Sequence, residues 1–316
     1  MKKILITPRS FQQSGMAALE LLKEKDYEAV INQTGTAYTE EQMLELCADI
    51  EGIIVGIDPV TERVLKSAKK LRAISKYGAG LDNIDLNTAV ELGIAVERAT
   101  GTNATSVAEL AIGLLFTLAR KIPFSSASTR QGVWDRIKGV ELTGKTLGIL
   151  GLGCIGKEVA RMAHGLGMNI FAHDPFVNEG DECIESYGIH MKTVDEILGH
   201  ADFITLHMPL TDTTRHMINK KTLEKMKAGA YLINTSRGEL VDEEALYDAL
   251  IKGSIAGAAE DVFSKEPPGQ HKLLSLDNFI LTSHIGAFTE EANMKMAMTS
   301  AVNLINLLER PKKVEA

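Results

Sequence analysis

Short apolar runs alternate with amphipathic stretches along the whole chain. In its first third, five such runs predict strands: Lys3–Thr7, Ala29–Ile31, Ile53–Val55, Leu71–Ser75 and Ile94–Glu97. The stretches between them have helical spacing, as in Ala17–Lys23, Glu40–Cys47 and Thr61–Ser67. Strands separated by helices form parallel sheets covered on both faces, so the pattern predicts a doubly wound α/β unit.

A second series of strands and helices begins at Lys145. The predicted strands are Thr146–Leu150, Asn169–His173, Phe203–Leu206, Tyr231–Asn234, Ile255–Ala259 and Phe279–Thr282. Helical patterns between them include Glu158–Leu166 and Glu243–Lys252. A long apolar helix, Ser106–Arg120, is expected to cross from the first unit to the second. The last helical stretch, Glu290–Leu308, is expected to pack back onto the first unit, which predicts two crossings and a hinge near Thr100–Thr102 and Ala287–Phe288.

Composition narrows the class of protein. The 316 residues are 45% hydrophobic and 24% charged, with a formal net charge of −8, which is typical of a globular protein and unfavourable for nucleic-acid binding. The longest apolar stretch, Leu110–Ala119, is too short to span a membrane, and the apolar run Ile4–Ile6 is too short for a secretory signal. Three widely spaced cysteines (Cys47, Cys154 and Cys183) indicate reduced thiols and a cytoplasmic protein.

One glycine motif follows a predicted strand. The segment Gly151-Leu152-Gly153-Cys154-Ile155-Gly156 comes directly after Thr146–Leu150, and we expect a helix after Gly156. In that context the three glycines allow a tight turn, close approach of a pyrophosphate, and close packing of helix on strand. The alternative is a purely structural turn between strand and helix.

Asp174 follows the next strand of the same series. A carboxylate there can accept hydrogen bonds from ribose hydroxyls and repels a 2′-phosphate, which favours NAD over NADP. Asp174-Pro175 is also a common start of a turn, so a structural role stays open.

Three polar residues follow later strands. Arg237, Glu266 and His284 come after the strands that begin at Tyr231, Ile255 and Phe279. Because ligands bind outside the carboxyl ends of parallel strands, we expect all three to face the cofactor crevice. Arginine can hold a carboxylate, histidine can shuttle a proton, and a carboxylate beside histidine favours its charged form. The set predicts hydride transfer between a nicotinamide and a 2-hydroxy or 2-keto acid.

Each of the three residues also has an ordinary structural interpretation. Taken singly, they are typical of a surface ion pair, a solvated loop carboxylate and a hydrogen-bonded histidine; their convergence behind a nucleotide motif favours chemistry. The other histidines have no metal-ligand spacing, so no metal site is expected.

The whole chain resembles the D-2-hydroxyacid dehydrogenase family, in particular its phosphoglycerate dehydrogenase branch. The segments that carry the resemblance are Gly78–Asp85, Asn103 with Ser106–Leu110, Gly151–Gly156, His207–Thr211, Asn234–Gly238, Asp261–Phe263 with Glu266-Pro267, and His284–Gly286. The resemblance implies a Rossmann nucleotide domain (residues 101–287) inserted in a flavodoxin-like substrate domain (residues 1–100 and 288–316). It also implies a homodimer through the nucleotide domains, with Trp134 in the dimer arm; the alternative for Trp134 is a local core position.

The resemblance also implies roles for individual residues. Arg237 would hold the substrate carboxylate, His284 would be the acid/base and Glu266 its partner. Cofactor-binding residues would be Gly151, Gly153, Cys154, Ile155, Gly156, Asp174, His207, Met208, Pro209, Thr235, Ser236, Asp261 and Gly286, with Asp261 near the nicotinamide carboxamide. Substrate-binding residues would be Gly78, Ala79, Gly80 and Asn103.

Two departures concern the substrate. Phosphoglycerate dehydrogenases commonly have Arg and Thr where this chain has Gly56 and Ala79, so two phosphate contacts are expected to be missing, with Lys76 and Arg9 as substitutes that are more often surface residues. The chain ends at Ala316, where longer relatives continue into a serine-binding regulatory domain, so we expect no control by serine.

The expected activity is therefore that of an NAD-dependent dehydrogenase of a small 2-hydroxy acid, phosphorylated or not. A glyoxylate or hydroxypyruvate reductase is the alternative within the family. An NAD-sensing corepressor is the alternative from another class.

Overall fold

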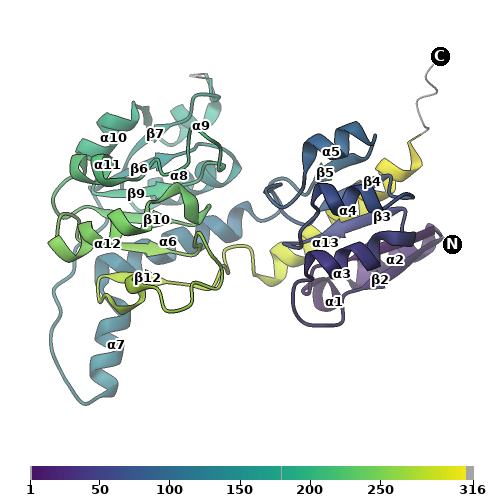
Figure 1. Ribbon diagram of the computed structural model, residues 1–316. Helices are drawn as coiled ribbons and strands as arrows, with labels where there is room; N and C mark the ends of the chain where they lie inside the picture. Colours follow the sequence, from purple (N-terminus) through teal and green to yellow (C-terminus); the bar gives the residue numbers. More distant parts are fainter. Residues whose placement is uncertain (1, 179, 311–316) are drawn as a thin grey trace. The chain divides into compact units, whose positions relative to one another are not determined.

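The first sheet is built from the N-terminal third of the chain. The computed structural model describes residues 2–178 and 180–310. The strands of this sheet are β1 (Lys2–Ile6), β2 (Tyr27–Ile31), β3 (Gly52–Val55), β4 (Ala73–Lys76) and β5 (Ala95–Arg98). They pair in parallel in the order β2-β1-β3-β4-β5, which is the flavodoxin-like order (Figure 1).

Helices cover both faces of the first sheet. They are α1 (Phe11–Ser14), α2 (Met16–Glu24), α3 (Glu40–Leu46), η1 (Cys47–Asp49), α4 (Glu62–Ser67), α5 (Leu86–Glu91) and α13 (Glu290–Glu309). Met43, Leu65 and Ala89 place α3, α4 and α5 in one apolar core. Leu22 and Leu304 place α2 and α13 in the other, so the C-terminal helix returns to the first sheet as its pattern predicted.

The second sheet has seven parallel strands. They are β6 (Thr146–Leu150), β7 (Asn169–His173), β8 (Ile189–Met191), β9 (Phe203–Leu206), β10 (Tyr231–Asn234), β11 (Gly257–Glu260) and β12 (Phe279–Leu281). Their order is β12-β11-β10-β9-β6-β7-β8, a Rossmann arrangement extended by one strand. The order reverses between β6 and β9, and that reversal is where such sheets bind ligands.

Helices also cover both faces of this sheet (Figure 1). They are α6 (Ala104–Arg120), α7 (Ile122–Arg130), α8 (Cys154–Gly165), α9 (Glu182–Ser186), α10 (Val194–His200), α11 (Lys220–Lys225), η2 (Gly238–Leu240), α12 (Glu243–Lys252) and η3 (Lys272–Ser275). Apolar residues of α6 and α8 share one core, and those of α10, α11 and α12 share the other.

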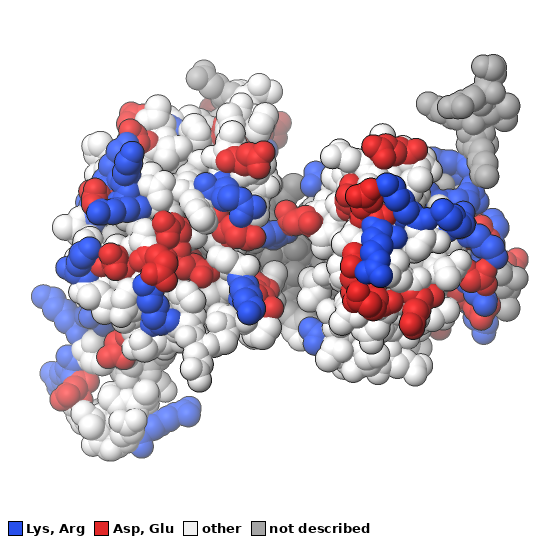
Figure 2. All heavy atoms as spheres, in the orientation of Figure 1, with Lys and Arg blue, Asp and Glu red and all other residues white. Residues whose placement is uncertain are grey.

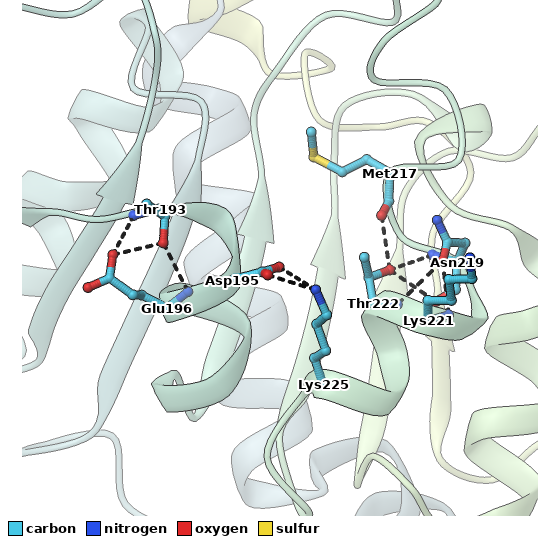
Figure 3. A network of polar contacts seen from close by, with 8 residues as sticks. All are labelled: Thr193, Asp195, Glu196, Met217, Asn219, Lys221, Thr222 and Lys225. Atoms are coloured by element: carbon cyan, nitrogen blue, oxygen red, sulfur yellow. Dashed lines mark hydrogen bonds and ion pairs between the residues drawn. The ribbon is translucent and has the colours of Figure 1, made fainter.

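Helices α10 and α11 show how local sequence fixes the ends of these elements. Thr193 caps α10 and Asn219 caps α11, each in a reciprocal capping box (Figure 3). Lys225 of α11 lies 2.7 Å from both carboxylate oxygens of Asp195 in α10, which links the two helices.

The chain divides into two compact units, Met1–Asn103 with Ala287–Ala316, and Ala104–Gly286. Residues 311–316 of the C-terminal piece lie outside the described residues. The long helix α6 begins at the first residue of the second unit. The expectation that this helix itself crosses between units was therefore wrong: the crossing precedes it.

Several boundaries differ from the sequence patterns. Helix α8 begins at Cys154, so Gly156 lies in its first turn and does not precede it. The strand expected at Ile255–Ala259 lies at Gly257–Glu260, two residues later. The sequence pattern missed β8 and α7, because a three-residue strand and a polar helix without buried residues have little hydrophobic periodicity.

Charges of both signs are mixed on the face that Figure 2 shows. Acidic and basic side chains alternate over the visible face of each unit (Figure 2). None of the described helices combines the length and the apolar character that crossing a bilayer requires.

Candidate active site

Two glycines of the motif that follows β6 leave no room for a side chain. Gly151 has a φ of +99°, and a Cβ there would lie 2.6 Å from the backbone carbonyl carbon of His207. A Cβ on Gly156 would lie 2.1 Å from the carbonyl oxygen of Gly151. The sequence therefore keeps this loop tight against the end of β9, at the reversal of strand order.

Gly153 has the opposite surroundings. It is the N-cap residue of α8, is exposed, and a Cβ added there would meet nothing within 4 Å. No side chain caps the helix, so the amides of its first turn point into this open space. Because the helix dipole also favours negative charge there, this cradle fits a pyrophosphate.

Asp174 follows β7 and lies beside the glycine loop. Its carboxylate accepts hydrogen bonds from the backbone N–H of Leu152 at 2.8 Å and of Phe176 at 2.9 Å. Asp174 thus fixes the glycine loop as well as its own turn. Each oxygen retains a further acceptor position, so both open interpretations of this residue remain compatible with the geometry.

The ends of β9 and β10 hold buried polar atoms without protein partners. His207 Nδ1 and Thr235 Oγ1 are buried and have no hydrogen-bond partner, while His207 Nε2 lies 2.9 Å from Thr205 Oγ1. Burial lowers the pKa of His207 to about 3, so its ring is neutral. Ser236 Oγ donates to the carbonyl oxygen of Met208 at 2.6 Å, which joins the two strand ends. Unpaired buried polar atoms at a strand-order reversal fit a bound nucleotide.

His284 and Glu266 form a pair. His284 Nδ1 lies 2.7 Å from Glu266 Oε2, and the other carboxylate oxygen, Oε1, accepts from the backbone N–H of Phe263 at 3.0 Å. The side chains are 45% and 38% exposed, so the pair is anchored at one end and open to a ligand at the other.

The pair shifts both pKa values. The hydrogen bond that His284 donates to the Glu266 carboxylate raises the pKa of His284 against the opposing effect of burial. Burial acts to raise the pKa of Glu266, but the hydrogen bond and the charge of His284 outweigh it, so that pKa is lowered. The charge of the Arg237 guanidinium acts on both groups in the lowering direction, although the pKa of His284 stays raised because Glu266 outweighs it. The structure therefore places Arg237, Glu266 and His284 close enough for their charges to interact.

The backbone at His284 is held in a conformation that side chains rarely adopt. Its φ is +56°, in the left-handed region. The buried carboxylate of Asp261 accepts from the backbone N–H groups of Ile285 and Gly286, both at 2.8 Å, and the N–H of His284 donates to the carbonyl oxygen of Asp261 at 2.9 Å. Asp261 therefore orients the loop that presents His284.

Arg237 is presented by a turn after β10. The side chain of Asn234 donates to the carbonyl oxygen of Arg237 at 2.9 Å and accepts from the N–H of Ser236 at 3.1 Å. A Cβ on the next residue, Gly238, would lie 2.0 Å from the carbonyl carbon of Phe263. The turn with Arg237 and the segment with Glu266 are thus packed back to back.

Most of the second unit matches a known protein family. Residues 112–286 match the family model "D-isomer specific 2-hydroxyacid dehydrogenase, NAD binding domain". The chain belongs to this family. A "D-3-phosphoglycerate dehydrogenase" of Methanocaldococcus jannaschii is 43% identical over the full chain, which spans 59% of that relative. A "Hydroxypyruvate reductase" of Thermotoga maritima is 41% identical over 89% of this chain and 91% of that protein.

Solved structures of this family have the same fold. A glyoxylate reductase from Paecilomyes thermophila matches with a TM-score of 0.88 at 32% identity, covering 98% of this chain and 96% of that one. The chain spans little more than half the length of the first curated relatives it matches.

The residues expected to bind substrate lie in the first unit. Gly78, Ala79 and Gly80 follow β4, and Asn103 is the last residue before the second unit. Gly78 has a φ of +125°, and Arg98 donates to the carbonyl oxygen of Ala79 at 3.2 Å. Their part in binding substrate stays a prediction.

Of the two candidate phosphate ligands, Lys76 differs from expectation, whereas Arg9 is exposed as expected. Lys76 is only 7% exposed, so the interpretation as a surface residue was wrong. Its ammonium group donates to the carbonyl oxygen of Gly56 and, at 2.7 Å, to Asn83 Oδ1. Arg9 donates to the carbonyl oxygen of Gly35 at 3.0 Å.

Sequence reasoning missed residues that support the site. The Thr282 hydroxyl donates to Asp261 Oδ1, and Glu260 lies fully buried at the end of β11. The signal for Glu260 was present as an acidic residue at the end of an apolar strand. Among the described residues, no group of three or more His, Cys, Asp or Glu side chains is placed to hold a metal ion.

Proposed function

We propose that this protein is an NAD-dependent oxidoreductase that interconverts a small 2-hydroxy acid and the corresponding 2-keto acid. The observation that carries the proposal is the 2.7 Å His284–Glu266 pair beside Arg237, in the unit that holds the glycine loop. The family relationship supports the same reaction.

Each side chain of this site has a defined task. NAD, when bound, supplies or accepts the hydride. Arg237 holds the substrate carboxylate, for which a guanidinium offers paired donors. His284, protonated, donates from its imidazole to the carbonyl oxygen during reduction and takes the proton back during oxidation. Glu266 keeps Nδ1 protonated, so Nε2 is the nitrogen that exchanges a proton with substrate.

The remaining site residues are proposed to bind the cofactor or the substrate. For the cofactor they are Gly151, Gly153, Cys154, Ile155, Gly156, Asp174, His207, Met208, Pro209, Thr235, Ser236, Asp261 and Gly286. Asp174 favours NAD because its charge repels a 2′-phosphate. For the substrate they are Gly78, Ala79, Gly80 and Asn103, which assigns the first unit to the substrate and the second to the nucleotide.

The choice of acid depends on the first unit. Gly56 and Ala79 carry no charge, and Lys76 already bonds Gly56 and Asn83, which favours an unphosphorylated acid such as hydroxypyruvate or glyoxylate. Phosphohydroxypyruvate is the second candidate, because Lys76 and Arg9 are cations near strand ends of this unit.

The test is NADH consumption with glyoxylate, hydroxypyruvate, phosphohydroxypyruvate, pyruvate and bulkier 2-keto acids. We expect turnover with at least one of them. His284→Ala and Arg237→Ala should each lower kcat/KM by roughly 10²–10⁴-fold while NADH still binds, because each loses transition-state contacts but no cofactor contact.

Three results are informative. Preference for phosphohydroxypyruvate would show that Lys76 or Arg9 binds phosphate. Preference for an unphosphorylated acid would indicate that Gly56 and Ala79 remove the phosphate contacts that phosphoglycerate dehydrogenases have at these positions. No turnover with any acid, although NADH binds, would contradict the proposal and favour an NAD-sensing regulator.

We further propose a cytoplasmic homodimer that associates through the second unit. Helix α7 has no buried residue, and the segment after it exposes Val133 and Trp134, the latter to 82%. An apolar surface of this kind is typical of an interface. Cys47, Cys154 and Cys183 are free thiols, which is usual in a reducing compartment.

A further inference from the structure

Glu243, in the first turn of α12, links two parts of the second unit. Its Oε1 accepts from the backbone N–H of Ser264 at 2.8 Å and from the Ser264 hydroxyl at 2.6 Å. Its Oε2 lies 3.2 Å from Nε2 of His271, and the side chain is only 14% exposed. All the strong contacts of this carboxylate are therefore with the loop that follows β11.

That loop carries Glu266. Ser264 directly follows Phe263, whose N–H donates to Glu266 Oε1 at 3.0 Å, and Glu266 Oε2 faces His284. A shift of the backbone at Ser264 would move the amide that orients Glu266. Ser264 donates two hydrogen bonds to Glu243, one from its backbone N–H and one from its hydroxyl, and these hold that backbone in place.

The same loop also packs closely against Gly238. A Cβ on Gly238 would lie 2.2 Å from the backbone nitrogen of Ser264. Since α12 follows the Arg237 turn after only η2, Val241 and the N-cap residue Asp242, Glu243 belongs to the same short connection as Arg237. Segment 263–266 thus contacts both Gly238 of this connection and Glu243 at the start of α12.

We propose that Glu243 is a positioning residue for the proton transfer, because it holds segment 263–266 so that Glu266 faces His284. This inference rests on the proposed function for its kinetic part. Glu243 itself faces His271, Ser264 and the buried carboxyl group of Glu260, whereas His284 is influenced by Glu266, Asp261 and Arg237.

Glu260 does not compete with Glu243 for the same donors. Burial, together with the charge of Glu243, raises the pKa of Glu260 to about 8, so this group is mostly a neutral acid at neutral pH. Of these two carboxyl groups, Glu243 is therefore the charged one that accepts hydrogen bonds from Ser264.

The neighbouring Glu244 provides a matched control. It lies in the same first turn of α12, but its side chain is 75% exposed and pairs with Lys272. Glu244→Ala removes the same charge from the same helix terminus without touching Ser264.

The experiment measures the His284 imidazole titration by NMR in the cofactor-free protein, and kcat and the NADH Kd on the best acid of the panel. We expect Glu243→Ala to lower the pKa of His284 and to reduce kcat by roughly 10- to 100-fold, with the NADH Kd within about twofold. Glu243→Gln, which keeps an acceptor for Ser264, should recover most of both losses. Ser264→Ala should lower the pKa of His284 in the same direction but less, and Glu244→Ala should change neither value.

An unchanged His284 titration in Glu243→Ala would overturn the proposal, as would equal effects of Glu244→Ala. If Glu243→Ala does not fold, Ser264→Ala decides, and an unaltered titration there would overturn it too. A wild-type protein without turnover would contradict the proposed function only, because the His284 titration still reports on the position of Glu266.

Discussion

At the scale of single residues, the site depends on how neighbouring groups orient and charge His284. Its Nδ1 is occupied by Glu266, and its backbone is fixed by Asp261 in a left-handed conformation. Two carboxylates thus have separate tasks: one sets the charge of the ring, and the other sets the direction of the loop. Both acids lie within six positions of the end of β11.

Replacing Glu266 by Gln tests the electrostatic part. The hydrogen bond that His284 donates to the Glu266 carboxylate raises the pKa of His284, so the loss of that carboxylate should lower the pKa. Reduction needs protonated His284 and fails as the pH rises through its pKa. The alkaline limb of the pH profile for reduction should therefore move to lower pH in Glu266→Gln. Oxidation needs neutral His284, so the acidic limb of its profile should also move to lower pH. Profiles of kcat/KM against pH measure both limbs; a limb that stays in place would show that another group controls the proton.

At the scale of elements, the glycine loop has two kinds of position. Gly151 and Gly156 are required by packing against β9 and within the loop, whereas Gly153 faces open space. The packing of the fold therefore depends on the first two glycines, and the third is the one proposed to contact the ligand.

Comparing Gly156→Ala with Gly153→Ala separates these effects. Gly156→Ala places a Cβ 2.1 Å from the Gly151 carbonyl oxygen and should destabilise the protein by about 1–3 kcal/mol. Gly153→Ala should leave stability nearly unchanged but weaken NADH binding, since its Cβ enters the proposed pyrophosphate cradle. Thermal unfolding and NADH fluorescence titration give the two readouts. Equal stability of the two variants would contradict the assignment of Gly156 to packing and of Gly153 to ligand binding.

At the scale of the whole molecule, the chain forms two compact units from three chain segments, with α13 completing the first unit. The second unit contains an exposed helix, α7, and the segment after it, which have few contacts with the rest of that unit's core. Such a helix is marginal alone, which supports its burial in an assembly.

Trp134→Glu tests this assembly. The substitution places a charge at a residue that is 82% exposed, so a monomer would tolerate it, whereas a dimer interface would not. Sedimentation equilibrium should show a dimer for the wild type and a weakened dimer for Trp134→Glu. Met16→Glu, at an exposed apolar residue of the first unit, is the control and should leave the dimer intact. A monomeric wild type would contradict the proposed dimer.

The sequence alone was sufficient to predict every strand of the described residues except β8, because buried parallel strands are continuous apolar runs bounded by turn residues. Four strands of the second sheet, including β6 and β10, have the predicted ends. Elements without a strong apolar pattern, β8 and α7, were missed. The start of α8 was misplaced because a helix can begin inside a glycine motif when its cap needs no side chain.

The chemistry divides in the same way. Residue types at strand ends determined the candidates Arg237, Glu266 and His284, because parallel strands bring their carboxyl ends to one edge. Only the tertiary structure decided that Glu266 faces His284, that Lys76 is buried against Gly56 and Asn83, and that Glu243 holds the loop of Glu266. These contacts join residues far apart in the chain, and their geometry depends on packing between loops, which no local pattern of apolar and polar residues encodes.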